Sequence, residues 1–182
     1  MHSETKTQRS KGDLLLGTAK FVIIVMGILI VFATVMHLIG LGALLTVERA
    51  ELMAKLAAAN APASGYIVII GFIAMLLVAL ALVAWFLRLA WQLIASVEIG
   101  DPFHEDNADR LRSMGWLTLV IQLLVTGATL IGRWMGTFVE GVDAPLEIGV
   151  QGTGFLLPLI LFILARIFRL GTQMRADLEG TV

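Results

Sequence analysis

The sequence predicts an all-α integral membrane protein, a four-helix bundle whose second, third and fourth helices extend into the cytoplasm. Three observations predict this fold. Hydrophobic residues make up 58% of the 182 residues and charged residues 15%, with a mean hydropathy of +0.91. Soluble domains are about 45–50% apolar and about 25% charged. The apolar residues also fall in four blocks, and most lysines and arginines lie on one side of the topology that those blocks define.

The blocks give the spans, because about 20 mostly apolar residues cross the roughly 30 Å of hydrocarbon in a bilayer. The expected spans are 21–45, 66–87, 115–132 and 148–165. The fourth is the weakest, since it contains Gln151 and Pro158. The first is longer than the apolar core of a cleaved signal peptide and lacks a good small-residue cleavage site. We therefore expect four helices that all remain in the protein.

The chain forms one domain in this interpretation. A disordered cytoplasmic tail, 1–11, precedes a single transmembrane domain, 12–175, and a cytoplasmic tail, 176–182, follows it. The second helix shows no stop signal until Gly100 and Pro102. It should therefore project about two to three turns beyond the bilayer. The fourth helix should likewise continue past its span.

Lysine and arginine decide the predicted orientation. Ten of the 13 lie in the termini, at the start of the first helix or around the central connection, whereas Arg49, Lys55 and Arg133 lie on the opposite side. Cytoplasmic loops collect these residues. Both termini and the central connection are therefore predicted to be cytoplasmic. On the outer side, "TVERAELMAKLAAAN" has the pattern of a short helix that lies on the membrane or covers the bundle.

The central connection, "EIGDPFHEDNADRLRSMGW" at 98–116, concentrates charge in an otherwise apolar chain. Asp106 or Asn107 is expected to cap the third helix, because both are good N-cap residues. Phe103 is expected to be a hydrophobic plug packed under the hairpin.

Two arginines of the fourth helix are expected to meet this hairpin. Arg166 and Arg169 lie three residues apart, on one helical face. We predict that at least one of them reaches an acid of the hairpin, with Glu98 and Asp109 as the leading candidates. Exposed pairs of this kind contribute about 0–1 kcal/mol, so they fix register more than stability.

The hairpin also carries a pattern, G-x-P-F…N…R-L-R…G, that resembles the bacterial family called domain of unknown function 2975. Its residues here are Gly100, Pro102, Phe103, Asn107, Arg110, Leu111, Arg112 and Gly115. The ending "ARIFRLGTQMRADLEGTV" is similar as well, so the resemblance covers nearly the whole chain. It implies a multi-pass protein of the bacterial inner membrane without an established activity. It also implies a partner, a small helix-turn-helix DNA-binding regulator that the membrane protein restrains or releases.

Polar residues elsewhere favour structural roles. His37 and Gln122 lie within spans, where polar groups are candidates for function, but hydrogen bonding to helices explains each of them. A cluster at the hairpin (His104, Glu105, Asp106, Asp109) and an outer acidic loop (Glu140, Asp143, Glu147) superficially suggest ion sites. The hairpin cluster lacks a second strong nitrogen or sulfur ligand beside His104. The outer loop offers three acids, whose oxygens could gather a hard cation. Solvated charge is the favoured interpretation of both.

The sequence therefore favours a membrane regulatory or adaptor protein that binds a soluble partner through its cytoplasmic face. The candidate partner-binding residues are Asp109, Arg110, Arg112, Arg166 and Arg169. No cysteine occurs and no catalytic arrangement is recognised, so we expect no enzyme, no metal, no cofactor and no direct binding of nucleic acid. Two alternatives stay open. One is a small transporter or channel component with a polar path past His37 and Gln122, and the other is a homo-oligomeric structural membrane protein.

Overall fold

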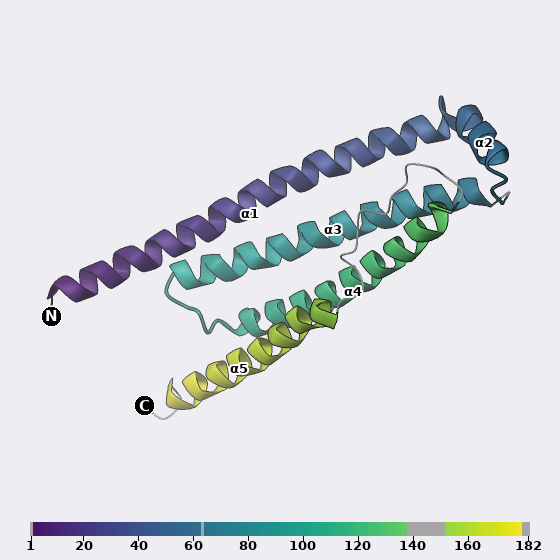
Figure 1. Cartoon of the computed structure of the whole chain (residues 1–182). Coiled ribbons are helices and arrows are strands. Elements are labelled where there is room, and N and C mark those ends of the chain that lie inside the picture. The colour runs from purple at the N-terminus through teal and green to yellow at the C-terminus, as the bar shows by residue number, and fades with distance from the viewer. Residues whose placement is uncertain (1, 63, 138–151, 180–182) are drawn as a thin grey trace.

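Helices make up the part of the chain that the structure, a computed structural model, describes: residues 2–62, 64–137 and 152–179. They are α1 (His2–Leu45), α2 (Arg49–Ala58), α3 (Gly65–Glu98), α4 (Glu105–Met135), the short 3-10 helix η1 (Gly152–Phe155) and α5 (Leu156–Glu179) (Figure 1). The described residues contain no strand. Helices α1, α3, α4 and α5 are long and apolar enough to cross a membrane. The predicted all-α class is therefore confirmed, and the number of helices able to span a membrane is the predicted four.

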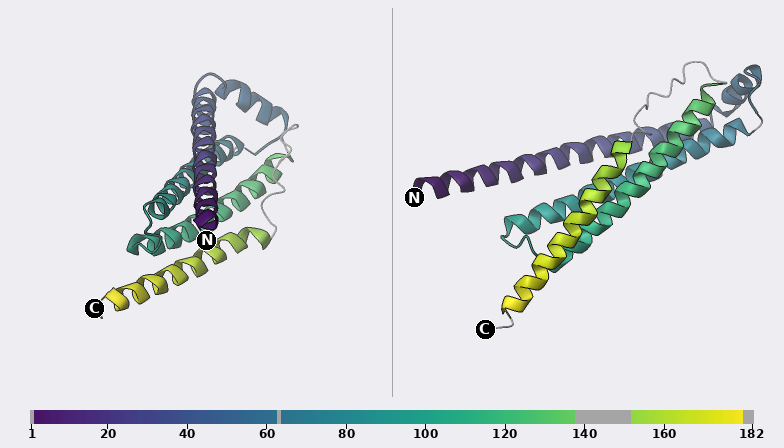
Figure 2. Two further views of the ribbon diagram at one scale, coloured as in Figure 1. Left: turned by 90° about the vertical axis from the view of Figure 1, so that its left-hand side faces the viewer. Right: turned by 60° about the horizontal axis from the view of Figure 1, so that its bottom comes forward.

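The four long helices of the predicted four-helix bundle form an open row, α1–α3–α4–α5 (Figure 2). Helix α3 packs between α1 and α4, and α4 packs between α3 and α5. Among the described residues, α1 approaches only α2 and α3 closely. The physical reason is that a spanning helix satisfies its own backbone hydrogen bonds, and lipid solvates apolar side chains. Protein contacts therefore need not cover every apolar face.

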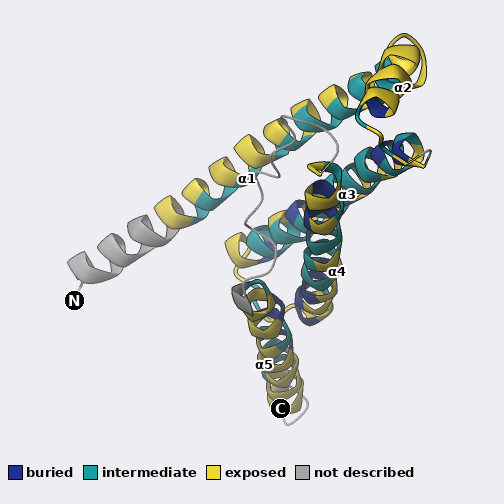
Figure 3. Cartoon of the chain, turned by 45° about the vertical axis from the view of Figure 1, so that its right-hand side comes forward, coloured by how far each residue is buried: buried dark blue, intermediate teal, exposed yellow. Residues whose placement is uncertain are grey.

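The buried core lies between α4 and α5. Leu111 and Met114 of α4 pack with Leu161 and Ala165 of α5, and α3 covers this cluster. The most apolar stretches of α1 and α3 contain no buried residue, as the exposed and intermediate colours along them show (Figure 3). These faces are suited to contact lipid. The α3–α4–α5 part is thus the structural unit that positions the charged hairpin.

Helix α1 begins at His2, so residues 2–11 are helical where the sequence predicts a disordered tail. Glutamate, lysine, glutamine and arginine in this segment are good helix formers. Once the apolar segment has nucleated the helix, each further residue adds one hydrogen bond, so the helix extends towards the N-terminus.

The fourth helix also differs from its predicted bounds. Residues 148–151 lie outside the described part, and α5 begins at Leu156 and continues to Glu179, into the predicted tail. Pro158 does not weaken this helix, because it lies in the first turn, where the N–H that proline lacks would have no partner within the helix.

Helix α2 covers the end of the molecule opposite the termini (Figure 1). The buried side chain of Leu56 packs against Gly65 at the start of α3. Asn60 adopts a left-handed conformation, φ +51°, just after α2, as asparagine does at helix C-termini. On the exposed face, Lys55 donates to Glu51 over 2.8 Å, which lowers the pKa of the Glu51 carboxyl and raises the pKa of Lys55.

Contacts at both ends attach α1 to α3. At the α2 end, the hydroxyl of Tyr66 donates to the carbonyl of Leu44 over 3.1 Å. At the other end, the ammonium group of Lys20 pairs with Glu98 and lies 5.0 Å from the ring centre of Trp91. Between these attachments α1 contributes no residue to the buried core.

Charged residues mark the two edges of the membrane-spanning region. Helix α4 carries no charged side chain between Arg112 and Arg133. The intervening 20 residues, 113–132, span about 30 Å, which matches the hydrocarbon thickness. Arg166 lines the same pocket as Arg112, Lys20 pairs with Glu98 at the end of α3, and Arg88 lies ten residues before that end. This is the end that also holds both termini and the α3–α4 turn (Figure 1).

The cysteine-free chain allows a direct topology test. Single cysteines placed by Glu105→Cys and Ala176→Cys should react with a membrane-impermeant maleimide only after the cytoplasmic side is opened. Ala57→Cys in α2 should react in intact cells, because α2 lies at the opposite end of the spans. Labelling of residues 57 and 105 from the same side would contradict the fold of four spans.

Candidate functional site

Gly100 builds the turn between α3 and α4. Its φ is +82°, a left-handed conformation that only glycine adopts without cost. The N–H of Gly100 donates to the carbonyl of Val97 over 3.1 Å, and the N–H of Asp101 donates to that of Ser96 over 3.0 Å. These two bonds define a Schellman motif. The prediction that glycine and proline end this helix is confirmed, since α3 ends at Glu98.

Asn107 fastens the two helices of the hairpin to each other. Its side chain is fully buried. The amide Nδ2 donates to the Ser96 hydroxyl over 2.6 Å and to the Pro102 carbonyl over 3.0 Å, and Oδ1 accepts from Arg110 over 2.8 Å. One side chain thus joins the last turns of α3, the connecting loop and the first turns of α4.

The N-cap of α4 is His104, so the prediction that Asp106 or Asn107 caps this helix is wrong. The His104 ring nitrogen Nδ1 accepts from the backbone N–H of Asp106 over 3.3 Å. Asn107 points inward, and Asp106 pairs with Arg110 over 3.1 Å within the first turns. Asp106 still lies where negative charge favours the helix N-terminus.

Phe103 packs on α5 rather than under the hairpin. Its ring centre lies 5.5 Å from that of Phe168. Gly171 leaves room for the ring, since a Cβ at residue 171 would lie 2.6 Å from it. The hydroxyl of Thr172 also donates to the Phe103 carbonyl over 3.1 Å. The predicted plug is therefore a contact between the hairpin and α5, and Gly171 is the residue that makes it fit.

Ion pairs add to this contact. Arg169 of α5 lies 2.5 Å from Asp109 of α4, which confirms the predicted pairing of an α5 arginine with a hairpin acid. Arg175 pairs with Asp101 over 2.6 Å. Glu98, the other predicted acid, instead pairs with a lysine of α1. Side chains in these pairs are about a third to three quarters exposed, so each pair contributes about 0–1 kcal/mol.

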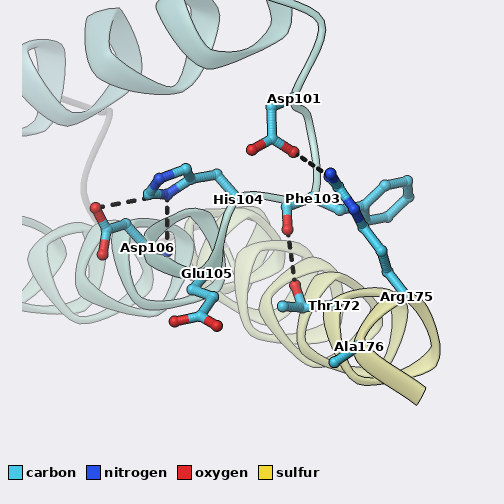
Figure 4. Close-up of a pocket in the computed structure, with 8 residues that line it drawn as sticks. All are labelled: Asp101, Phe103, His104, Glu105, Asp106, Thr172, Arg175 and Ala176. Carbon is cyan, nitrogen blue, oxygen red and sulfur yellow. Dashed lines mark hydrogen bonds and ion pairs between the residues drawn. The ribbon is translucent and has the colours of Figure 1, made fainter. Parts of the chain in front are cut away.

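A pocket of about 220 Å³ opens between the hairpin and the last turns of α5 (Figure 4). We call it the tip pocket; it is lined by Asp101, Phe103, His104, Glu105, Asp106, Thr172, Arg175 and Ala176. Three carboxylates face one guanidinium group and one imidazole ring. Glu105 has no ion-pair partner among the described side chains. The tip pocket is therefore suited to a positively charged side chain.

A second pocket, of about 260 Å³, lies further along the α4–α5 pair, towards the membrane-spanning region. We call it the arginine pocket; it is lined by Arg112, Phe162, Ala165, Arg166 and Arg169. Arg112 and Arg166 form no hydrogen bond or ion pair with the side chains that the structure describes. Of the five predicted partner-binding residues, Arg110 is thus engaged inside the hairpin, Asp109 and Arg169 pair with each other, and the other two remain available.

The intramembrane polar residues lie apart from both pockets. His37 Nδ1 is 2.8 Å from the carbonyl of Ala33 in its own helix. Gln122 lies against η1, where a Cβ on Gly154 would be 2.5 Å from its amide. Helices α1 and α4 do not approach closely in the described residues, so these two side chains lie on helices that are not packed together.

Acidic and histidine side chains do not gather into an ion site in the described residues, where no group of three could hold a metal. Apart from Glu105, the acids of the hairpin instead form the ion pairs described above. The outer acids, Glu140, Asp143 and Glu147, lie outside the described residues.

Comparison with protein families places most of the chain in a family. Residues 44–182 match the family described as "Protein of unknown function (DUF2975)". The match includes α2 to α5 and the whole hairpin, but nearly all of α1 precedes it, so the resemblance covers less of the chain than expected from the sequence. No curated protein and no solved structure matches the chain.

Replacing Asn107 tests the hairpin junction. Asn107→Ala removes the donor to the Pro102 carbonyl and one of the two bonds of the Ser96 hydroxyl, which still donates to the Leu93 carbonyl. A buried polar group without a partner costs about 1–3 kcal/mol. We expect a lower midpoint of thermal unfolding in detergent, followed by circular dichroism. Ser113→Ala, at an exposed position of the same helix, is the control. Equal midpoints for the two variants would show that the junction does not stabilise the fold.

Replacing Gly115 tests the α4–α5 contact. A Cβ there would lie 2.8 Å from the Phe162 ring, so Gly115→Val should separate the helices and cost about 1–3 kcal/mol. Gly71→Val, where no atom lies within 4 Å of the added Cβ, should have a smaller effect. Adding Phe162→Ala should make the change at 115 nearly neutral in the same unfolding assay. Strictly additive effects would contradict the contact.

Proposed function

The chain belongs to the DUF2975 family of proteins of unknown function, and we propose that it is a membrane adaptor or regulatory protein that captures a soluble partner at the hairpin end. The observation that supports this function best is the tip pocket, an acidic pocket held in place by the Asn107 junction and by α5. The proposal assigns no catalysis and no cofactor to the protein.

The position of the tip pocket suits a soluble partner. Glu105 lies seven residues before Arg112 along α4, which is about 10 Å, and Ala176 lies ten residues after Arg166, which is about 15 Å. If these arginines lie at the edge of the hydrocarbon, the tip pocket stands in water beyond the headgroups. The predicted orientation places it in the cytoplasm.

The charge of the tip pocket suits a basic partner. An exposed carboxylate such as that of Glu105 can form a charge-assisted hydrogen bond with a lysine or arginine. Proteins that bind DNA carry basic surfaces that neutralise phosphates. A small helix-turn-helix regulator, the partner that the family resemblance implies, has such a surface. Capture at the membrane would withhold that surface from DNA, whereas the carboxylates themselves would repel nucleic acid.

This proposal changes the predicted set of partner-binding residues. Arg110 is needed inside the hairpin, so we assign it a structural role. Glu105 and Arg175 enter the set because they line the tip pocket. The sequence places Glu105 in a cluster of solvated charge and does not indicate that it meets Arg175, since the pocket exists only where α5 passes the hairpin.

Reversing one charge tests the proposal. Glu105→Lys should weaken capture of the partner about tenfold or more, because it replaces an attraction with a repulsion. A tenfold loss corresponds to a change of about 1.4 kcal/mol in the binding free energy. The assay is crosslinking and affinity capture from native membranes, with the small DNA-binding protein quantified by mass spectrometry. Glu48→Lys, at the opposite end of the molecule, is the matched control. Capture that is absent from the wild type, or equally strong in both variants, would refute the proposal.

A further inference from the structure

We infer that Arg112, Arg166 and Arg169 form a binding site for the phosphate headgroup of an anionic phospholipid. The inference is independent of partner capture, since the arginine pocket shares no lining residue with the tip pocket. It arises from the geometry of the α4–α5 pair, from the charge of the pocket and from the height of the pocket in the bilayer.

The packing of α4 on α5 brings the three guanidinium groups together. The helices run antiparallel, with Gly115 against Phe162 and Asp109 beside Arg169, so Arg112 of α4 comes level with Arg166 of α5. All three arginines border one pocket, whose remaining lining is apolar, Phe162 and Ala165. Residues from two helices thus line one space that combines three arginines with two apolar side chains.

The charges of the pocket are not balanced within the described protein. Asp109 pairs with Arg169, but Arg112 and Arg166 have no carboxylate partner among the described side chains. Like charges held close together repel, and an anion between them would remove that repulsion. Arginine suits a phosphate in particular, because its planar group donates two parallel hydrogen bonds to phosphate oxygens.

The height of the pocket identifies the source of the phosphate. The uncharged stretch that begins after Arg112 is about 30 Å long, which puts Arg112 at the level of the lipid phosphates. Trp116, one turn further into the bilayer, is 57% exposed and packs edge-on against Phe162 with ring centres 5.4 Å apart. Tryptophan is typical of this interfacial layer.

The depths of the arginines and of the apolar side chains in the bilayer match the phosphate and the acyl chains of a phospholipid. The arginines lie where its phosphate would be, and Phe162, Ala165 and Trp116 lie where its first acyl carbons would be. Basic pockets between transmembrane helices on the cytoplasmic side are suited to anionic headgroups such as those of cardiolipin. A free phosphate ion would satisfy the arginines but would leave the apolar side chains uncovered.

The test uses the purified full-length protein in detergent, with retained phosphatidylglycerol and phosphatidylcholine measured by native mass spectrometry. The wild type should retain phosphatidylglycerol preferentially. The double variant Arg112→Gln/Arg166→Gln should reduce that retention about tenfold or more, because each cation near the surface contributes to anionic-lipid binding. Arg133→Gln, at the opposite edge of α4, is the matched control and should retain the wild-type preference.

Further arms separate the alternatives. If the glutamine variant does not fold, as judged by circular dichroism, the double variant Arg112→Lys/Arg166→Lys takes its place. This variant keeps both charges. It should retain less phosphatidylglycerol than the wild type, because lysine lacks the paired donors of arginine. Equal retention of the two lipids by the wild type, or equal loss in the control, would overturn the inference. Competition by millimolar inorganic phosphate that removes the bound lipid would also overturn it, in favour of a free-anion site.

Discussion

A fully buried asparagine holds the hairpin on which the rest of this structure depends. Asn107 bonds to Ser96 of α3, to the Pro102 carbonyl in the loop and to Arg110 of α4. A polar side chain is tolerated in such a place only when its donors and acceptors are satisfied. The requirement to satisfy Asn107 therefore fixes how the ends of α3 and α4 face each other.

Helix α5 is added to this hairpin through contacts of a different kind. Phe103 packs against Phe168 and over Gly171, and Gly115 accepts the Phe162 ring. Small residues that admit aromatic rings are a common way to bring helices together where lipid offers no competing hydrophobic gain. The ion pairs between α5 and the hairpin are too exposed to contribute much stability, so they select the register of α5 instead.

The result is one packed end of the molecule with two pockets at different heights. The tip pocket is acidic and lies beyond the spans, and the arginine pocket is basic and lies at their edge. Together they suit a protein that holds a soluble partner close to an anionic membrane surface. Helix α1 belongs to neither pocket and contacts α3 from the other side, consistent with a family match that begins at residue 44.

Much of this fold could be predicted because spans depend on composition and length. The end of α3 just before Gly100 follows from a local pattern, the glycine and proline signal. The spacing of Arg166 and Arg169 on one helical face likewise predicts that an arginine of α5 meets an acid of the hairpin, as Arg169 meets Asp109. The open row could not be predicted, since periodicity does not distinguish a face that meets lipid from one that meets protein. The inward turn of Asn107 was missed because an asparagine near a helix start usually caps it.

The central claim is that the Asn107 junction fixes the hairpin end as one unit with α5. Double electron–electron resonance between spin labels at Glu105→Cys and Ala176→Cys, in lipid nanodiscs, measures this most directly. The account predicts a single narrow distance distribution in the otherwise unchanged chain and a broad one when Asn107→Ala is added. A distribution that is equally narrow with and without Asn107, or broad in both, would contradict it.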